Sequence, residues 1–261
     1  MKWRVCILLA TIILVSLVIL FLVPAIPQSE VYHKFADDRP LLGVPNCLDV
    51  ISNVLFLVVG LLGLRFVSLR SVGKRPLVVY PSERWVWLTF FSGITLTAFG
   101  SAYYHLNPND STLVWDRIPM AISFMALVVA VVAERISVSA ATRLLAPLLV
   151  LGAGSVIYWR VTQANSRGDL RPYILVQFGS LSVLVMLLAL FKPRYTRGSD
   201  LIVSLGIYAL AKIFEAADLQ IFTLGGFVSG HTFKHIAAAI SAYWILRMLQ
   251  RRVPIVSEPT P

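Results

Sequence analysis

The chain alternates long apolar runs with short polar stretches. Eight runs have the length and composition of membrane helices, because a bilayer core of about 30 Å takes roughly 20 helical residues. None of them shows the period-two alternation of an outer-membrane barrel strand. The predicted helices are 5–23, 47–64, 85–104, 113–132, 144–159, 173–191, 201–219 and 228–249. The pattern therefore predicts an all-α integral membrane protein with several passes.

The first run is separated from the other seven by the longest polar loop. It is longer than the hydrophobic part of a signal peptide, about 7–15 residues, and the stretch LVPAIPQ contains no A-x-A cleavage site. We therefore expect a retained helix, with a cleaved signal peptide as the alternative. The expected divisions are an anchor helix in 1–24, an extracytoplasmic loop in 25–45, a seven-helix domain in 46–250 and a disordered cytoplasmic tail in 251–261. The fold class is thus a seven-transmembrane-helix bundle with one additional N-terminal transmembrane helix.

Composition supports this class, and the distribution of charge predicts its orientation. Only 14% of the residues are charged and 57% are hydrophobic, whereas about a quarter of a soluble domain is charged. With the N-terminus in the cytoplasm, fifteen of the 23 Lys and Arg residues lie at inner helix ends and five in outer loops. This bias follows the positive-inside rule, so both termini are predicted to be cytoplasmic. The net charge of +10 then reflects topology and contact with anionic lipid, and no nucleic-acid partner is expected.

Polar residues inside the apolar runs gather at one membrane face. An ionisable side chain at the centre of a membrane helix costs about 2.5–3.5 kcal/mol on insertion scales, so such residues usually line a cavity, form pairs or bind an ion. The predicted topology places the following at the outer ends of their helices: Asp49, Asn53, Ser101, His105, Asp116, Glu215, Asp218, His231 and His235. The charge count did not use these positions, so their convergence independently indicates a site towards the extracytoplasmic leaflet.

Histidine spacing indicates a metal site at this face. His231 and His235 in HTFKH are i, i+4, so both rings project from one side of a helix and can bind one ion. His105 is the other histidine at similar depth. Three histidines plus a water make up a catalytic zinc site with an open position. A proton relay, or a pair of polar histidines facing the bundle, is the alternative interpretation.

A serine and an aspartate accompany His105. Ser101 and His105 are also i, i+4, so both can face one cavity. Alternatively, Ser101 bonds the carbonyl four residues earlier, and Asp116 is a carboxylate stabilised by the N-terminus of its helix. Arg117 follows Asp116 but lies about 100° round the helix, so it is not expected at the metal.

These motifs together resemble the alkaline ceramidase family, within the CREST superfamily of seven-helix membrane hydrolases. SAYYH ends one helix, Asp116 follows His105 by eleven residues, and HTFKH begins the last helix. DVISN, residues 49–53, matches the acid-then-Ser-Asn pattern of the first core helix of the family. The match covers about 37–248, and its order and spacing are more specific than any single motif.

The resemblance implies a function and a site. A catalytic Zn²⁺ would be held by His105, His231 and His235, with Ser101 and Asp116 beside the metal-bound water. The implied reaction cleaves the amide of a ceramide or other N-acyl membrane lipid, giving a fatty acid and an amine, the sphingoid base. Asp116 is expected to act as general base and then general acid, and Ser101 to donate a hydrogen bond.

The resemblance also raises a calcium site. Eukaryotic ceramidases of this type bind Ca²⁺ through an acidic N-terminal cluster. The matching region here reads FADDRPLLGVPN, in which Arg39 and Pro40 follow the two aspartates. The residues expected to support the zinc site or to bind Ca²⁺ are Asp37, Asp38, Asn46, Asp49, Asn53, Glu215 and Asp218.

Two other functions remain open at the level of sequence. A lipase of the same superfamily would use the same residues on ester-linked lipids, and no motif separates amide from ester substrates. A transporter or receptor would use the histidines and Asp116 as a proton relay without a metal. The absence of Gly/Pro-broken helix pairs in matched halves counts against a transporter.

Overall fold

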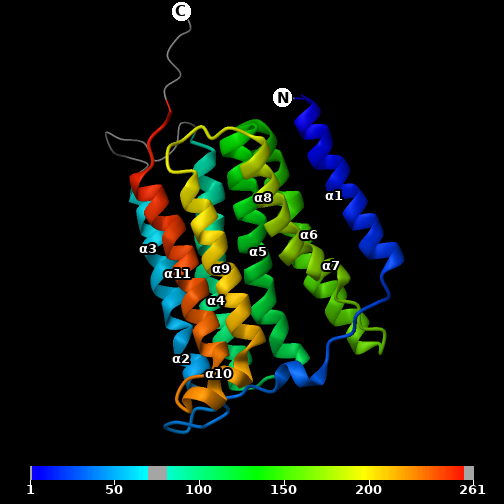
Figure 1. Ribbon diagram of the computed structural model, residues 1–261, viewed down its shortest axis with the longest axis vertical. Coiled ribbons are helices and arrows are strands. Elements are labelled where there is room, and N and C mark those ends of the chain that lie inside the picture. The colour runs from blue at the N-terminus through cyan, green and yellow to red at the C-terminus, as the bar shows by residue number, and fades with distance from the viewer. Residues whose placement is uncertain (1, 70–80, 256–261) are drawn as a thin grey trace, which may run out of the picture.

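The computed structural model describes residues 2–69 and 81–255, and the described chain is a bundle of long helices (Figure 1). No strand occurs in these ranges, only two isolated β-bridges. The helices are α1 (Lys2–Leu22), η1 (Glu30–His33), α2 (Cys47–Ser52), α3 (Val54–Leu69), α4 (Glu83–Leu106), α5 (Asp110–Arg135), α6 (Val138–Ala164), α7 (Arg171–Ile174), η3 (Leu175–Gly179), α8 (Ser180–Leu190), α9 (Ser199–Ala216), α10 (Asp218–Gly225) and α11 (Gly230–Arg251). The all-α prediction is confirmed.

Six helical stretches in the described ranges are long and apolar enough to cross a membrane. They are α1, the α2–α3 pair, α4, α5, α6 and the α7–α8 stretch, so a multi-pass membrane protein is confirmed. The other two predicted spans correspond to α9 and α11. Charged and polar side chains, among them Lys212, Glu215 and the histidines of HTFKH, lower the apolar character of these two helices. The count of seven spans plus one therefore stays a prediction.

The two described ends of the chain lie at the same end of the bundle, and α2 and α10 lie at the opposite end (Figure 1). This arrangement agrees with a chain that crosses an even number of times. It does not assign either end to the cytoplasm, which remains a prediction from the arginine count. Within the bundle α4 packs against α3 and α5, α11 packs against α9 and α3, and α5 packs against α6.

Helix α1 lies outside the other helices, against α7 and α8 (Figure 1). Arg4 Nη1 donates to the Leu190 carbonyl at 2.8 Å, and Arg171 Nη1 donates to the carbonyls of Leu20 and Val23 at 2.9 and 2.6 Å. Most residues of α1 are exposed, including Phe21 at 77%, while Leu8 is buried and Val5 and Ile12 pack against the core. Such an apolar surface is stable in contact with lipid, in agreement with an added anchor helix.

Helix α5 begins earlier than predicted, at Asp110, so the turn after α4 is only 107–109. The cause is a capping box, in which Asn109 Oδ1 accepts from the Thr112 amide at 3.1 Å and the Asn109 amide donates to Thr112 Oγ1 at 3.2 Å. The polar residues 110–112, predicted to lie in a loop, thus form the first turn of α5. The capping box fixes where α5 starts and so where Asp116 lies.

The predicted disordered tail is partly ordered. Residues 252–255 return along 194–196, where the Thr196 amide donates to the Val253 carbonyl and the Ile255 amide to the Arg194 carbonyl, both at 2.9 Å. These backbone hydrogen bonds order the segment 252–255. Its sequence is Pro-rich and has no helix or strand periodicity, so order there could not be predicted from the sequence. The rest of the predicted tail, 256–261, lies outside the described residues.

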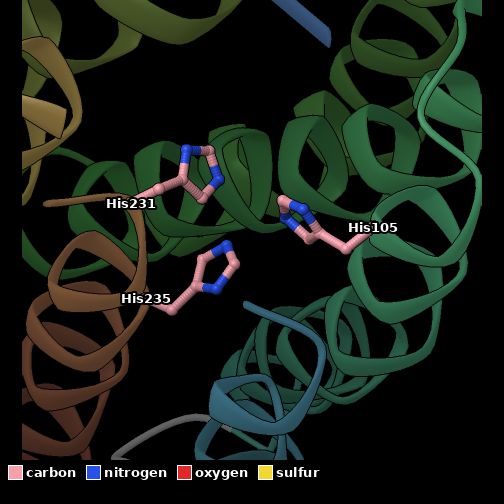
Figure 2. Close-up of side chains that lie close together, drawn as sticks. All are labelled: His105, His231 and His235. Carbon is pink, nitrogen blue, oxygen red and sulfur yellow. The ribbon is translucent and has the colours of Figure 1, made fainter. Parts of the chain in front are cut away.

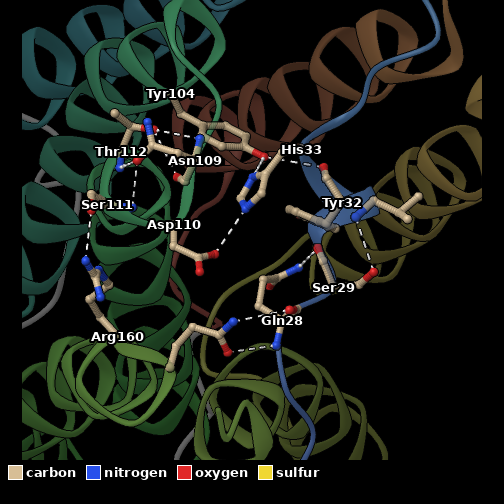
Figure 3. A network of polar contacts seen from close by, with 12 residues as sticks. Gln28, Ser29, Tyr32, His33, Tyr104, Asn109, Asp110, Ser111, Thr112 and Arg160 are labelled. Atoms are coloured by element: carbon tan, nitrogen blue, oxygen red, sulfur yellow. Dashed lines mark hydrogen bonds and ion pairs between the residues drawn. The ribbon is translucent and has the colours of Figure 1, made fainter. Parts of the chain in front are cut away.

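The loop between α1 and α2 runs along the end of the bundle that holds α2 and α10 (Figure 1), and a network of polar contacts holds it there (Figure 3). His33 bridges two groups, with Nδ1 3.0 Å from the Tyr104 hydroxyl and Nε2 3.0 Å from Asp110 Oδ1. The Gln28 amide donates to Gln163 Oε1 at 3.0 Å. The loop therefore contacts α4, α5 and α6, and it closes that end of the bundle.

Candidate metal centre

Three buried histidine rings face one another at the end of the bundle covered by this loop (Figure 2). His105 comes from the last turn of α4, and His231 and His235 come from the first turns of α11. The ring centroids are 4.9–5.0 Å apart, and one ligand nitrogen from each ring lies within 4.8 Å of the others. The structure thus brings together the three residues predicted as metal ligands.

Hydrogen bonds to neighbouring elements set the orientation of these histidines. Ser52 Oγ is 2.8 Å from His235 Nδ1, which leaves His235 Nε2 on the side of the other rings (Figure 2). Asn46 Nδ2 donates to the His105 carbonyl at 2.8 Å. Fixing the second nitrogen of a ligand histidine is the usual way in which a protein orients a metal site.

Several ring nitrogens have no partner. Neither nitrogen of His105 makes a hydrogen bond, and neither does Nε2 of His235, although these atoms are fully buried. Buried polar atoms are nearly always bonded, and each neutral imidazole offers one acceptor nitrogen, so these unpartnered rings call for a ligand. Neutral imidazole nitrogens are among the preferred ligands of zinc. The donor set therefore fits a metal ion, and it fits zinc among other transition metals.

Lys234 lies against the same cluster. Its Nζ donates to His231 Nε2 at 3.0 Å and forms an ion pair with Glu215 Oε1 at 3.2 Å. The ammonium and a metal ion compete for one lone pair of His231. Coordination through this nitrogen would require Lys234 to turn towards Glu215, which already contacts it and which also pairs with Lys212.

Phe35 covers the histidines from the side of the loop. Its ring centroid is 4.5 Å from that of His105 and 4.7 Å from that of His231. The Ala36 amide next to it donates to Asp218 Oδ2 at 3.0 Å, which ties this part of the loop to the start of α10. The phenyl ring excludes water from one side of the cluster.

Asp116 and Ser101 lie beside the histidines on the wall of one apolar cavity, which His235 also lines. The Asp116 carboxylate is in hydrogen-bonding reach of the Ser101 hydroxyl. Gly100 makes this approach of α4 and α5 possible, because a Cβ at that position would collide with the Trp115 carbonyl. The prediction that Ser101 and Asp116 share a cavity with a histidine agrees with this geometry, while their catalytic roles stay predictions.

The cavity continues deep into the bundle between α4, α5, α9 and α11. Its apolar walls include Phe90, Leu127 and Ile245. Ile245 is ten residues beyond His235, a distance of about 15 Å along a helix. The cavity therefore has the length and the lining to hold an alkyl chain whose end lies at the histidines.

The four polar residues predicted to support the site lie around it rather than in it. Asp49 Oδ1 accepts from Thr232 Oγ1 at 2.5 Å, and its backbone carbonyl accepts from Asn53 Nδ2 at 2.7 Å. Asp218 Oδ1 accepts from the His231 amide at 2.7 Å, and Glu215 forms the lysine pairs described above. Asp49 and Asp218 both hold the first turn of α11, so their contacts position the two histidines of that turn.

Asp37 and Asp38, the acidic pair of the predicted Ca²⁺ site, differ in their surroundings. Asp37 is buried and accepts from Arg39 Nε at 2.6 Å and from Nη2 at 2.8 Å, while Asp38 is exposed. The Arg39 hydrogen bonds hold the pKa of the Asp37 carboxyl below its ordinary value. In the described ranges the histidine cluster is the one group of three or more His, Cys, Asp or Glu side chains close enough to hold an ion. Calcium binding therefore has no support in this geometry.

Sequence reasoning missed Ser52, Phe35 and the contact of Lys234 with His231. Ser52 is within the motif DVISN, so its i, i+3 spacing from Asp49 was a usable signal. Lys234 lies inside HTFKH, where three positions from His231 place it on the same helix face. Phe35 is in a loop, and nothing in the local pattern indicates where its ring will pack.

Comparison of the chain with protein families, with curated proteins and with solved structures finds no match. The resemblance to alkaline ceramidases therefore stays a prediction. It depends on motif residues that the structure does bring close together, namely Ser101, His105, Asp116, His231 and His235.

Proposed function

We propose that this chain is a zinc-dependent intramembrane hydrolase that cleaves the amide bond of ceramide-like N-acyl lipids to a fatty acid and an amine. The observation that supports it most strongly is the convergence of three buried imidazoles beside an apolar cavity, with Asp116 on the wall of that cavity. Three histidines are a ligand set of catalytic zinc sites. A zinc ion there would supply Lewis-acid chemistry, which polarises a carbonyl and makes water more acidic.

The side chains around the histidines provide proton transfer and orientation. Asp116 takes a proton from the attacking water and passes it to the nitrogen of the leaving amine. Ser101 donates a hydrogen bond to the oxygen that gains negative charge. The water thus adds its hydroxyl to the acyl carbon and its proton to the nitrogen as the C–N bond breaks. The acyl chain lies in the apolar cavity, away from water.

One observation favours a second candidate function, a proton relay in a transporter or receptor. The ammonium of Lys234 bonds His231 directly, and Glu215 links it to Lys212. This chain of ionisable groups needs no metal. It predicts an ion-coupled flux and no bound metal, so metal analysis separates the two functions.

The test begins with metal analysis of the full chain purified in detergent. We expect about one zinc per chain in the wild type, as for other three-histidine sites. The His231→Ala/His235→Ala double variant should lose both the zinc and the hydrolysis. His33→Ala is the matched control, because His33 lies outside the cluster and bonds Tyr104 and Asp110 instead.

A panel of N-acyl and O-acyl lipids then decides the substrate. Zinc-dependent release of fatty acid from the amides supports the proposal, whereas release from the esters alone assigns the chain to the ester lipases. A metal-free wild type, or a double variant that keeps its zinc, would contradict the metal centre.

A further inference from the structure

A second cavity lies next to the histidine cluster, and we call it the polar cavity because charged side chains line part of its wall. It is lined by charged groups from three helices, which are Asp116 and Arg117 on α5, Lys212 and Glu215 on α9, and Lys234 on α11. Asp116, Lys212, Glu215 and Lys234 also line the apolar cavity, so the two cavities meet beside the histidines, and Arg117 alone of these five belongs only to the second cavity. We propose that this polar cavity binds an anionic group, a phosphate, sulfonate or carboxylate, on the head group of the lipid substrate.

Arg117 is the main reason for this assignment. Its side chain is buried, with 5% of the residue exposed, and in the described ranges no carboxylate forms an ion pair with it. Nη2 donates to Gln28 Oε1 at 2.6 Å, while Nη1 has no hydrogen-bond partner. A buried charge that lacks a counter-charge is costly. An anion in the cavity that Arg117 lines supplies both the counter-charge and the missing acceptor.

Aromatic rings hold the guanidinium in place. Its Cζ is 4.3 Å from the ring centroid of Trp159, 4.8 Å from that of Tyr173 and 5.3 Å from that of Tyr32. Cation–π contacts of this kind stabilise a cation without neutralising its charge. The guanidinium is therefore oriented in advance, and its planar fork is suited to phosphate, sulfonate and carboxylate groups.

The other four charged groups of the cavity balance one another, with Lys212 and Lys234 opposite Glu215 and Asp116. Glu215 is shared between Lys212 and Lys234, so one carboxylate faces two ammonium groups. Asp116 faces Ser101 at the junction of the two cavities. Arg117 is therefore the source of the net positive charge of the cavity, and a lipid with an anionic head group is favoured over a neutral one.

The inference rests on the proposed function for the placement of the substrate. With the amide carbon at the histidines, the acyl chain occupies the apolar cavity and the amine half extends into the polar one. The polar cavity then selects N-acyl lipids whose amine half carries a negative charge.

The test uses two matched amides, N-dodecanoyl taurine with a sulfonate and N-dodecanoyl ethanolamine with a neutral hydroxyl. Their binding to the full chain in nanodiscs, and the release of products in the same samples, are read by native mass spectrometry. We expect about tenfold tighter binding of the taurine amide, as for one charge-assisted hydrogen bond. Arg117→Gln should abolish this preference and Arg117→Lys should restore part of it. Arg160→Gln, which removes a positive charge at the same end but outside both cavities, should keep it.

The other outcomes of this experiment test the anion site and the hydrolase separately. Equal binding of the two amides by the wild type without competition by inorganic phosphate, or a preference unchanged in folded Arg117→Gln, overturns the anion site. If Arg117→Gln does not fold, an unchanged preference in Lys212→Gln overturns it instead. Competition by millimolar inorganic phosphate, without discrimination between the amides, supports the anion site but assigns it to a free anion. An Arg117-dependent preference in protein that has no zinc and cleaves neither amide supports the anion site while contradicting the hydrolase.

Discussion

Buried polar side chains form a group at each end of the bundle, and the two groups are built differently. At the end where the chain terminates, Arg252 Nη1 donates to Glu134 Oε2 at 3.0 Å, and the Tyr195 hydroxyl donates to Glu83 at 3.1 Å. Each of these two carboxylates thus has a donor from a distant part of the chain. At the other end, three imidazoles face one another and both nitrogens of His105 have no partner.

The difference is that one cluster balances its charges within the protein and the other leaves polar groups unsatisfied. The ion pair between Glu134 and Arg252 neutralises two buried charges within the protein, so it needs no counter-charge from a ligand, although Nε and Nη2 of Arg252 have no hydrogen-bond partner. Unbonded imidazoles and the unpaired guanidinium of Arg117 leave acceptors and charge for a ligand to satisfy. Substitutions at the two ends should therefore affect different properties, namely stability at one end and chemistry at the other.

The largest effect is expected from Asp116→Asn, which keeps the shape of the side chain but removes its basicity. Loss of a general base should lower turnover of the amide substrate by about 10²–10⁴-fold. The zinc content should not change, because Asp116 is not among the three predicted ligands. Hydrolysis assays and metal analysis on the same preparation measure both quantities. Glu134→Gln is the control, and undiminished turnover in Asp116→Asn would exclude Asp116 as the base.

The converse test is the stability of Glu134→Gln. This change leaves Arg252, which is 8% exposed, without its carboxylate. Removing one partner of a buried ion pair costs about 3–5 kcal/mol, so unfolding of the detergent-solubilised chain should require markedly milder conditions. Turnover per folded molecule should stay at the wild-type level. Asp200→Asn breaks the more exposed pair with Arg197 and should cost no more than about 1 kcal/mol. Equal losses in both variants would contradict the structural role of the buried pair.

The fold was largely predictable because its signal is local. Each of the eight apolar runs corresponds to a helix or to a helical stretch with a short break, since the length of an apolar run is itself the property that the bilayer selects. The errors lie at helix boundaries, where a polar residue is compatible both with a loop and with the first or last turn of a helix. NDST was interpreted as a loop, although Asn109 and Thr112 form a capping box, and 201–219 was interpreted as one helix, although α9 ends at Ala216.

The site was predictable to the extent that the depth of each residue in the membrane could be calculated from the sequence. Counting arginines placed His105, His231 and His235 at one level, and helical periodicity placed the last two on one face. The sequence does not indicate which neighbour a side chain contacts across the bundle, because packing between distant segments decides it. Phe35 over the histidines and Arg117 among three aromatic rings are contacts of this kind.

Gly100→Ala tests how closely the chemistry depends on the approach of α4 to α5. The added methyl group would collide with the Trp115 carbonyl, next to Asp116. We expect a stability loss of about 1–3 kcal/mol, typical of overpacking, together with reduced turnover, because Ser101 moves away from Asp116. Gly154→Ala in α6 is the matched control, since its Cβ would meet no atom within 4 Å. Identical behaviour of the two variants would show that the α4–α5 contact can relax without consequence.

The smallest effect is expected at the Asp37–Arg39 pair, which fixes the loop that covers the histidines. The Arg39 hydrogen bonds lower the pKa of Asp37 in the folded protein, so the pair stabilises the fold fully above the ordinary pKa of about 3.9. That contribution is lost as the pH falls through the lowered pKa. Asp37→Asn should therefore unfold slightly more easily than the wild type at pH 7, by at most about 1 kcal/mol, and should match it in strong acid.

The measurement is thermal unfolding in detergent across this pH range, with the exposed neighbour Asp38→Asn as the control. Added calcium should leave the wild-type transition unchanged, because two guanidinium nitrogens already occupy the Asp37 carboxylate. Arg39→Ala removes both donors and leaves the carboxylate open to a cation. A calcium-dependent rise in wild-type stability would show that Arg39 gives way to the ion, and the loop over the histidines would then respond to calcium after all.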